Sequence, residues 1–253
     1  MRAPDILRLV YRNVVVNTDY GTLIILVGLP ALYLVFFGYG FQSLAAGASH
    51  SYLDFLAPGI VSFQTVMAGI AGGSMLWADR RWGMLAQLLV GPFSRLQYLL
   101  GIMLTSVVFG FAGAAVMMVA AYLLTGSLAV TAAGALMIVG AILVGSILFG
   151  SLMLYISALV KSNNAYNSIQ VLIIFVVNFA STVFYSISPA IPAPLRALFL
   201  VNPLTYLANI VRDGYMGRVT TGDLYQLLGV TAVMLALLTL AVRSYMRSGV
   251  SFS

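Results

Sequence analysis

The sequence contains no cysteine, no glutamate and only one histidine, His50, and 7% of its 253 residues are charged. Without cysteine the chain has neither a disulfide framework nor a thiolate ligand for a metal. A zinc cluster and a pair of glutamates for acid–base catalysis are also excluded, because the required side chains are missing. We expect His50 to lie in a solvated loop.

Motifs that bind phosphate or activate a nucleophile are missing as well. The single lysine, Lys161, follows Val160 rather than the glycine of a Gly-Lys-Ser/Thr loop. Residues 72–76, GGSML, have the first half of a nucleophile elbow but lack its closing glycine and lie in an apolar run. We therefore expect no catalytic residue, no metal site and no cofactor site in this chain.

Apolar residues make up 62% of the chain, and the mean hydropathy is +1.04. Soluble domains have about 25% charged residues, so this composition indicates a membrane protein. No long polar segment is present to form a second, soluble domain, and we expect one domain over residues 1–253. The net charge of +6 is dispersed over short loops, which argues against a nucleic-acid partner.

Six apolar runs are long enough to cross a hydrocarbon core, which takes about 20 helical residues. Their residues do not alternate between apolar and polar, which favours helices over barrel strands. The sequence therefore predicts an all-α membrane protein with spans near 22–41, 55–76, 99–124, 132–159, 168–187 and 224–242.

The basic residues predict the orientation of these spans. An even number of spans places both termini on one side of the membrane. Nine of the twelve Arg and Lys residues then lie on the side of the termini, and three lie on the other. Because positive residues accumulate in cytoplasmic loops, we expect both termini to be cytoplasmic.

Residues 77–95, WADRRWGMLAQLLVGPFSR, lie between the second and third spans. We predict a short amphipathic helix that begins near Asp79 and stops at Gly91. Its apolar face consists of Trp82, Leu85, Leu88 and Leu89. Residues 94–97 then have the Ser-x-x-Gln form of a capping box, which predicts the start of the third span. On these residues alone, an anchor on lipid head groups and a docking surface for a cytoplasmic partner both remain open.

Two further segments are expected at the membrane surface. Residues 1–19 place Arg8 and Arg12 one turn apart, opposite an apolar face, which predicts an in-plane helix before the first span. Residues 189–217 are apolar but broken by prolines, and we predict short helices that dip into the outer leaflet or lie on it. There Asn202 and Pro203 form a favourable N-cap and first helical residue. An apolar stripe follows at Leu204, Leu207, Val211 and Tyr215.

The interiors of the predicted spans contain no Asp, Lys or Arg, whereas many ion-coupled transporters have one near the midplane. Their polar side chains are neutral: Gln64 in the second span, and Asn178, Ser181 and Thr182 in the fifth. Hydrogen bonds between helices are the ordinary explanation for such residues, and a substrate pathway is the alternative. Small residues four apart, such as Gly69 and Gly73, predict close helix packing.

Three separated segments carry a resemblance to a known family. They are YLDFLAPGIV at 52–61, RRWGMLAQLLVGPFSRLQYLLG at 80–101 and VNPLTYLANIVRDGYMG at 201–217. In this order they resemble the hallmark segments of ABC-2 type permeases, the membrane subunits of ATP-binding-cassette exporters. One departure is visible in the cytoplasmic helix, where family members often have acidic residues and this chain has Met84, Ala86 and Gln87. This argues against a salt bridge there but not against the helix.

The resemblance implies a separate nucleotide-binding subunit that holds ATP and Mg²⁺, so this chain by itself would not be an enzyme. The helix after the second span would be the coupling element, in which the arginines, Arg95 among them, face that partner or lipid. The coupling residues implied are Arg80, Arg81, Trp82, Gly83, Leu85 and Leu88. The outer motif comprises Asn202, Pro203, Tyr206 and Arg212.

The resemblance also implies a homodimer or heterodimer of permeases in a prokaryotic plasma membrane, with a path between the first, second and fifth spans. Relatives of this kind export amphipathic drugs, lipo-oligosaccharides or lipid-linked polysaccharides, and neutral polar groups suit any of these substrates. An ion-coupled transporter or channel is the first alternative, and a membrane enzyme or scaffold is the second. A nucleotide-binding protein encoded next to this chain would favour the exporter.

Overall fold

The computed structural model describes residues 3–42, 52–91, 93–126, 128–188 and 191–247, and all regular structure in these ranges is helical. The predicted all-α class is confirmed. In chain order the helices are α1 (Ala3–Val16), α2 (Tyr20–Leu23), the π-helical turn η1 (Ile24–Gly28), α3 (Leu29–Gln42), α4 (Tyr52–Arg81), α5 (Met84–Val90), α6 (Arg95–Thr125), α7 (Ala132–Leu159), α8 (Asn163–Phe179), α9 (Ala193–Val201), α10 (Pro203–Tyr215) and α11 (Thr221–Arg247).

Among the described residues, five helical segments are long and apolar enough to cross a membrane. They are Tyr20–Phe41, which includes α2, η1 and most of α3, and the helices α4, α6, α7 and α11. These five match the first, second, third, fourth and sixth predicted spans. Several are longer than predicted at their ends, since charged residues such as Arg81 and Arg247 continue the helix beyond the apolar run.

Helix α4 forms the centre of the bundle and packs against both α6 and α7. Within the apolar part of α4, 89% of the residues are buried, against 17% for α11 at the periphery. The close packing predicted at Gly69 and Gly73 is confirmed. A Cβ atom on Gly69 would lie 2.5 Å from the carbonyl carbon of Phe149 in α7, so only glycine allows the two helices to approach this closely.

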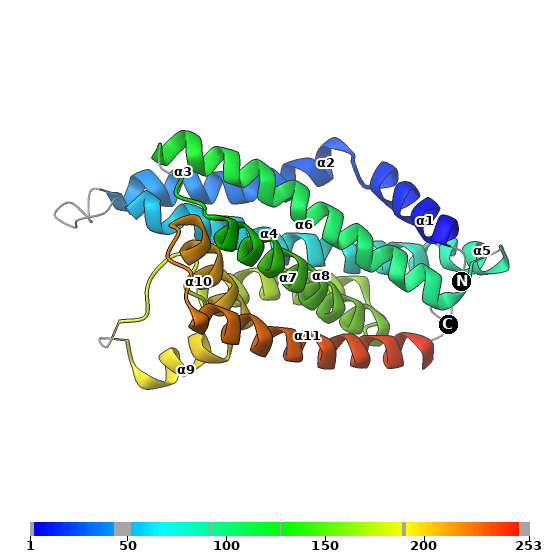
Figure 1. Ribbon diagram of the computed structural model, residues 1–253. Helices are drawn as coiled ribbons and strands as arrows, with labels where there is room; N and C mark the ends of the chain where they lie inside the picture. Colours follow the sequence, from blue (N-terminus) through cyan, green and yellow to red (C-terminus); the bar gives the residue numbers. More distant parts are fainter. Residues whose placement is uncertain (1–2, 43–51, 92, 127, 189–190, 248–253) are drawn as a thin grey trace.

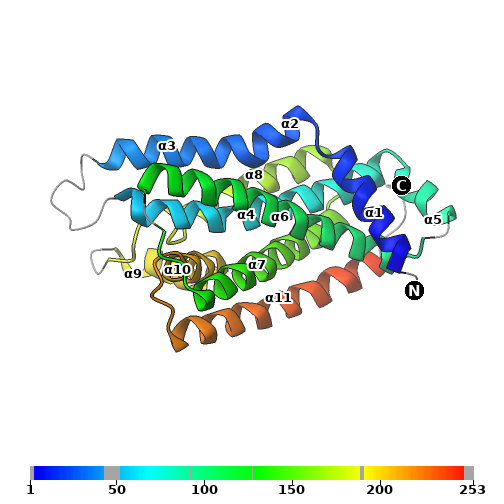
Figure 2. The same ribbon diagram turned by 45° about the horizontal axis from the view of Figure 1, so that its top comes forward.

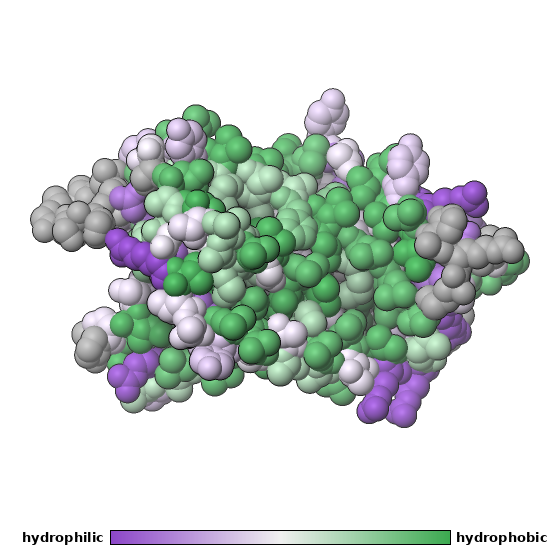
Figure 3. Space-filling view, in the orientation of Figure 1, coloured by the Kyte–Doolittle hydropathy of each residue, from purple (hydrophilic) through white to green (hydrophobic). Residues whose placement is uncertain are grey.

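The two ends of the bundle differ in what they hold. The first turn of α1, the short helix α5 and the last turn of α11 lie at one end, which we call the α5 end (Figures 1 and 2). Helices α9 and α10 lie at the opposite end, which we call the α10 end. Figure 3 shows hydrophobic residues over the middle of one face and hydrophilic residues gathered toward both ends, as expected for a molecule that crosses a bilayer.

The fifth predicted span, 168–187, is observed as a shorter helix that begins earlier. Helix α8 has 17 residues and ends at Phe179, after which the chain turns. Carbonyls at its C-terminal end accept hydrogen bonds from a residue outside the helix: the Asn202 side chain donates to Val177 O (2.6 Å) and Ala180 O (2.7 Å). The apolar run continues beyond this point, but the helix stops where a distant amide replaces the intrahelical bonds.

The broken segment before the last span also forms two helices, as predicted. Helices α9 and α10 meet at an angle of 71°. Asn202 caps α10 by accepting from Leu204 N (3.0 Å), and Pro203 is its first residue. The chain enters and leaves this pair at the same end of the bundle (Figure 1), which is the geometry of a re-entrant segment.

Candidate functional site

The last turn of α4 connects the bundle to the N-terminal helix. Asp79 accepts two hydrogen bonds from the guanidinium of Arg12, at 2.8 and 2.9 Å, and a third from the Tyr98 hydroxyl at 2.7 Å. The hydrogen bond from Arg12 to Asp79 raises the pKa of Arg12 above its ordinary value, although burial opposes the shift. Arg12–Asp79 is the one ion pair found within the described ranges, and it fastens α1 to the point where α4 ends.

Neighbouring residues of the same turn bind two other helices. Arg80 is 5% exposed and donates to Ser157 O of α7 at 2.6 Å. Trp77 donates to the Asn163 side chain at 3.1 Å and stacks on Tyr166 of α8, with ring centroids 4.6 Å apart. The end of α4 is therefore a junction, defined by Trp77, Asp79 and Arg80, that contacts α1, α6, α7 and α8.

This arrangement corrects the predicted start of the short helix and the predicted position of one coupling residue, Arg80. Asp79 does not begin the short helix, because Asp79, Arg80 and Arg81 form the last turn of α4. Arg80 was expected to face outward, but its guanidinium is buried and donates a hydrogen bond to a carbonyl at the end of α7. Arg81 is exposed, as expected.

The short helix predicted after the second span is observed as α5, seven residues from Met84 to Val90. Gly83 precedes it with φ of 71°, a left-handed conformation that glycine adopts without strain and that turns the chain away from α4. Leu85 is 1% exposed and fastens α5 to the bundle, with Leu88 partly buried beside it. Trp82 does not share this face, because it precedes the turn at Gly83, and it is 73% exposed beside the Arg81 guanidinium.

The predicted capping box at 94–97 is confirmed, and it starts α6 directly after α5. Gln97 N donates to Ser94 Oγ (3.2 Å), and Ser94 N donates to Gln97 Oε1 (2.8 Å). Gly83 thus sets the start of α5, and the capping box sets the start of α6, the next helix. The outer surface of α5 exposes Val90 (89% exposed) and Gln87, which leaves an apolar and polar strip at the tip of the molecule.

The four neutral residues predicted for a substrate pathway are all buried in this structure. Gln64 lies against Gly113 of α6, and Thr182 donates to Thr205 O of α10 at 3.0 Å. Asn178 and Ser181 bond within their own segment, Asn178 to Ile174 O and Ser181 to Asn178 O. The hydrogen bond between segments is thus observed for Thr182, and substrate contact stays a prediction for all four.

A pocket of 140 Å³ lies instead between the first span, α4 and α8. One part of its wall is apolar, with Leu26, Met67, Ile70 and Ala71, and the other is neutral and polar, with Asn17, Thr22, Ser74 and Gln170. Leu26 belongs to the π-helical turn η1, a local widening of the helix that occurs frequently at functional sites. No charged side chain lines this pocket.

At the α10 end, Arg212 joins three segments, and it forms no ion pair within the part of the chain that the structure describes. Its guanidinium donates to Phe55 O (3.1 Å), Thr182 O (2.8 Å) and the Asn209 side chain (2.9 Å). It also lies over the Phe55 ring, 3.8 Å from the ring centroid. The predicted outer motif is therefore held in place by Arg212 on one side and by Asn202, through its bonds to α8, on the other.

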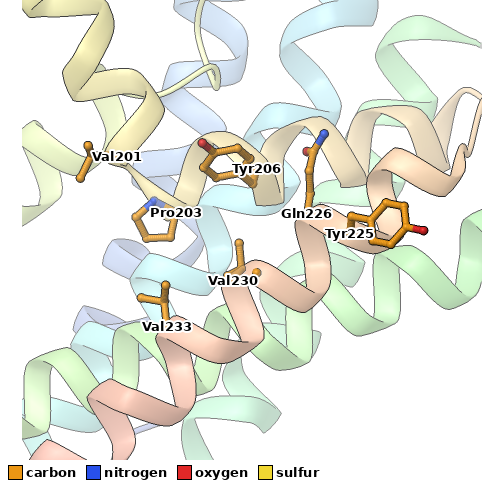
Figure 4. Close-up of a pocket in the computed structure, with 8 residues that line it drawn as sticks. Val201, Pro203, Tyr206, Tyr225, Gln226, Val230 and Val233 are labelled. Atoms are coloured by element: carbon orange, nitrogen blue, oxygen red, sulfur yellow. The ribbon is translucent and has the colours of Figure 1, made fainter.

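The remaining motif residues line a groove at the same end. Pro203 and Tyr206 of α10 and Val201 of α9 face Tyr225, Gln226, Val230 and Val233 of α11 across a space of 440 Å³ (Figure 4). The Tyr206 hydroxyl donates to Leu200 O at 2.6 Å. This groove is largely apolar and lies beside the place where α10 packs against the last span.

Sequence reasoning missed most of the partners in these sites. The pairing of Arg12 with Asp79 joins residues 67 positions apart, and Asn17, Thr22, Ser74 and Gln170 belong to three separate segments. The one local signal was the position of Arg12 in an amphipathic helix, one turn after Arg8. That signal indicated a surface residue rather than a partner for α4.

Comparison with known proteins gives a family for this arrangement. The family model of the ABC-2 type transporter matches residues 7–216, which include most of α1 and all helices from α2 to α10. A search among curated proteins found no match. The matched range includes the α4 junction, α5 and the re-entrant pair of α9 and α10. The chain therefore belongs to the ABC-2 type transporter family, as a multi-pass permease component whose ATP-binding-cassette partner is a separate subunit.

Proposed function

We propose that the chain is the membrane subunit of an ATP-driven exporter that moves an amphipathic molecule out of the cytoplasm or the inner leaflet. Helix α5 is the docking element for the ATP-binding-cassette subunit, which supplies ATP and Mg²⁺. The observation that carries this proposal is the strip on α5, where Val90 is 89% exposed at the tip of the bundle. Trp82 (73% exposed) and Met84 (36% exposed) precede it in the same short segment, and a group of exposed apolar side chains at the tip is a surface that a protein partner would cover.

The α4 junction explains how α5 would drive the bundle. Leu85 fastens α5, and three bonded residues at the end of α4 reach α1, α7 and α8 within one turn. A displacement of α5 is therefore passed to several helices together, because each contact is short and buried or partly buried. A helix that only rested on lipid would need no such connections.

The substrate class follows from the pocket between the first span, α4 and α8. Its wall combines four apolar residues with four neutral polar ones and has no charge. A molecule with an apolar body and a hydroxylated or amide-bearing head would match this wall, as amphipathic drugs and lipid-linked saccharides do. A volume of 140 Å³ accommodates only part of such a molecule, so the pocket would widen as the first span and α4 separate.

We further propose that two permeases, identical or related, assemble in a prokaryotic plasma membrane with the α5 end in the cytoplasm. Dimerisation would cover the exposed apolar residues of the first span and α8, such as Phe36 and Leu172. The orientation rests on the excess of basic residues at the α5 end. Because the chain has no cysteine, single cysteines report the orientation directly. Cysteine at Ser94 or Ser162 should be protected in intact cells, and cysteine at Ala193 should be labelled from outside; the reverse pattern would contradict the orientation.

Docking is tested with two exposed valines at opposite ends. Val90 on α5 and Val201 on α9 are 89% and 82% exposed, so Asp at either position should leave the fold intact. Val90→Asp should weaken co-purification of the ATP-binding-cassette subunit by at least about tenfold, because an unpaired charge in an apolar contact costs several kcal/mol. Val201→Asp should leave this binding unchanged. Equal binding by both variants, at equal membrane levels, would refute docking through α5.

The pocket is tested by filling it. Ala71→Leu places a larger side chain in the wall between α4 and α8, and it should lower export and substrate-stimulated ATP hydrolysis while basal hydrolysis and subunit assembly persist. Ala115→Leu is the control, because it makes the same substitution at an exposed position of α6. Normal export by the Ala71→Leu complex would remove this pocket from the substrate path.

A further inference from the structure

A second hollow lies at the α5 end, between the last turns of α7 and α11. It measures 520 Å³ and is lined by Tyr155 and Leu159 of α7 and by Leu240, Arg243, Ser244 and Arg247 of α11. On each helix these residues recur at intervals of three or four positions, with Arg243 and Ser244 adjacent, so each helix turns one side toward the hollow. The hollow is separate from α5, from the α4 junction and from the pocket beside α8.

Two arginines dominate its charge. Arg243 and Arg247 are one helical turn apart, and both are exposed. No acidic residue lines the hollow, and the one ion pair found within the described ranges involves neither arginine. Two guanidiniums at this spacing present donors to a single anion, and phosphate accepts such forked donors well.

The ends of the two helices do not neutralise this charge. Both α7 and α11 end here, and each C-terminus has about half a negative charge. However, other arginines already donate to carbonyls near these ends, Arg80 to Ser157 O and Arg95 to Met246 O. Arg243 and Arg247 therefore retain a net positive charge for an external anion.

The rest of the hollow is apolar and continues toward the middle of the membrane. Leu159 and Leu240 are about half exposed at its wall. Further along the same helices, Leu143 and Leu235 are also exposed, and the face shown in Figure 3 is largely hydrophobic between the two ends of the molecule. A cationic head site thus adjoins a surface suited to a hydrocarbon chain.

We propose that this hollow binds one anionic phospholipid. Its phosphate lies between Arg243 and Arg247, and an acyl chain follows the exposed leucines of α7 and α11. A protein partner with acidic residues would use the two arginines but would leave the half-exposed leucines toward the bilayer unexplained. A soluble phosphate compound would also leave these leucines without a role, so the apolar surface that continues from the hollow favours a lipid.

Native mass spectrometry of the full-length chain in detergent tests the proposal, with phosphatidylglycerol and phosphatidylcholine of identical acyl chains as probes. The parental protein should retain phosphatidylglycerol in preference, and Arg243→Gln/Arg247→Gln should lower its affinity roughly tenfold or more. Arg196→Gln/Arg218→Gln removes two exposed arginines at the α10 end and should change nothing. Glycerophosphoglycerol, which has the head group without chains, should not bind at the same concentration.

Conservative variants keep the result interpretable. Arg243→Lys/Arg247→Lys should retain the lipid preference, and the thermal unfolding midpoint of every variant without added lipid should match the parent. An equal loss of phosphatidylglycerol affinity in both arginine-to-glutamine double variants would mean that the lipid is held by general charge attraction, and this result would overturn the proposed site. Unchanged lipid affinity with weaker binding of the ATP-binding-cassette subunit would identify a protein interface, and binding of the chain-free head group would identify a soluble phosphate site. Either result would overturn the proposal.

Discussion

Two arginines at opposite ends of the molecule are held in different ways. At the α5 end, Arg12 makes a two-pronged ion pair with Asp79, and the two side chains are 26% and 11% exposed. At the α10 end, Arg212 is buried and donates to two backbone carbonyls and one amide oxygen. The first contact depends on an opposite charge, whereas the second depends on the shape of the site around a charge that stays unpaired within the described ranges.

This difference predicts how each contact responds to substitution. An ion pair can be exchanged for its mirror image, because both charges are carried by side chains. The backbone acceptors of Arg212 cannot be exchanged, so only a side chain with the same planar fork can satisfy them. The α5 end should therefore tolerate a charge swap, and the α10 end should tolerate hardly any change at Arg212.

The largest effect is expected for Arg212→Ala. This change removes a donor from three buried or partly buried acceptors, of which Asn209 keeps the Thr182 hydroxyl as a second donor. It also opens a cavity and removes the contact with the Phe55 ring. Relief from burying a charge offsets part of the loss, and we expect a net fall of about 2–4 kcal/mol in the free energy of unfolding. Equilibrium unfolding in mixed micelles measures it.

Two further variants separate charge from shape at this position. Arg212→Lys keeps the charge but loses the fork, so it should recover only part of the stability. Arg212→Met fills the space without charge or donors and should remain less stable than the parent. Parental stability in the Met variant would show that packing alone holds the re-entrant pair.

The second effect concerns the ion pair. Arg12→Asp and Asp79→Arg should each cost about 1–3 kcal/mol, because each places like charges together in a partly buried site. The double variant should recover at least about 1 kcal/mol of the summed loss. Recovery should stay incomplete, since Tyr98 also donates to Asp79 and loses its carboxylate acceptor in the swap.

A charge-swap cycle with a different arginine tests whether the recovery is specific to the Arg12–Asp79 pair. The same cycle with Arg81 in place of Arg12 should show no recovery, because no ion pair joins Arg81 to Asp79 in the described structure. A double variant of Arg12 and Asp79 that is as unstable as the sum of the two single variants would mean that the pair contributes nothing. In that case α1 would be held by Leu9 and Asn13 alone, which are buried against α6.

The sequence predicted the local features at both ends but not the contacts between segments. The N-cap and proline of α10, its buried stripe and the capping box of α6 are read from neighbouring residues, and the structure confirms them. The predicted bounds of five of the six spans were also close to the observed helices, because an apolar run of about 20 residues can cross a membrane in few conformations other than a helix. Each of these features depends on a few adjacent positions.

The failures share one physical cause. The end of α8 was misplaced because Asn202, more than twenty positions later, bonds its last carbonyls. Arg80 was expected outside because an arginine next to Arg81 and Trp82 resembles a surface cluster, and only the position of Ser157 O shows why it is buried. Periodicity reports the face on which a residue lies, but it does not report which distant element covers that face.

The third effect tests the amide contacts at the α10 end. Asn202→Ser keeps an N-cap acceptor for Leu204 N but cannot donate to Val177 O and Ala180 O, and it should cost about 1–2 kcal/mol. Asn202→Ala loses the cap as well and should cost about 1 kcal/mol more. Hydrogen exchange at the C-terminal turn of α8 should rise in both variants. Unchanged exchange there would separate Asn202 from the end of α8 and leave it as a cap for α10 only.

The smallest effect is expected at Ser94, where the α5 end depends on a local contact rather than on charge. Ser94→Ala removes the acceptor for Gln97 N and should cost about 1 kcal/mol, whereas Ser94→Asp should restore the cap. The loss should be local, because the capping box holds only the first turn of α6, close to the end of α5, and the rest of α6 is held by packing. Amide exchange in Met84–Val90 and in the first turn of α6 should rise without a matching rise in α4. Ser162→Ala is the matched control, since its cap bond to Ala165 N is longer, at 3.5 Å, and its removal should change less. If both alanine variants loosen α5 equally, the capping box does not hold this helix, and Leu85 alone fixes its position.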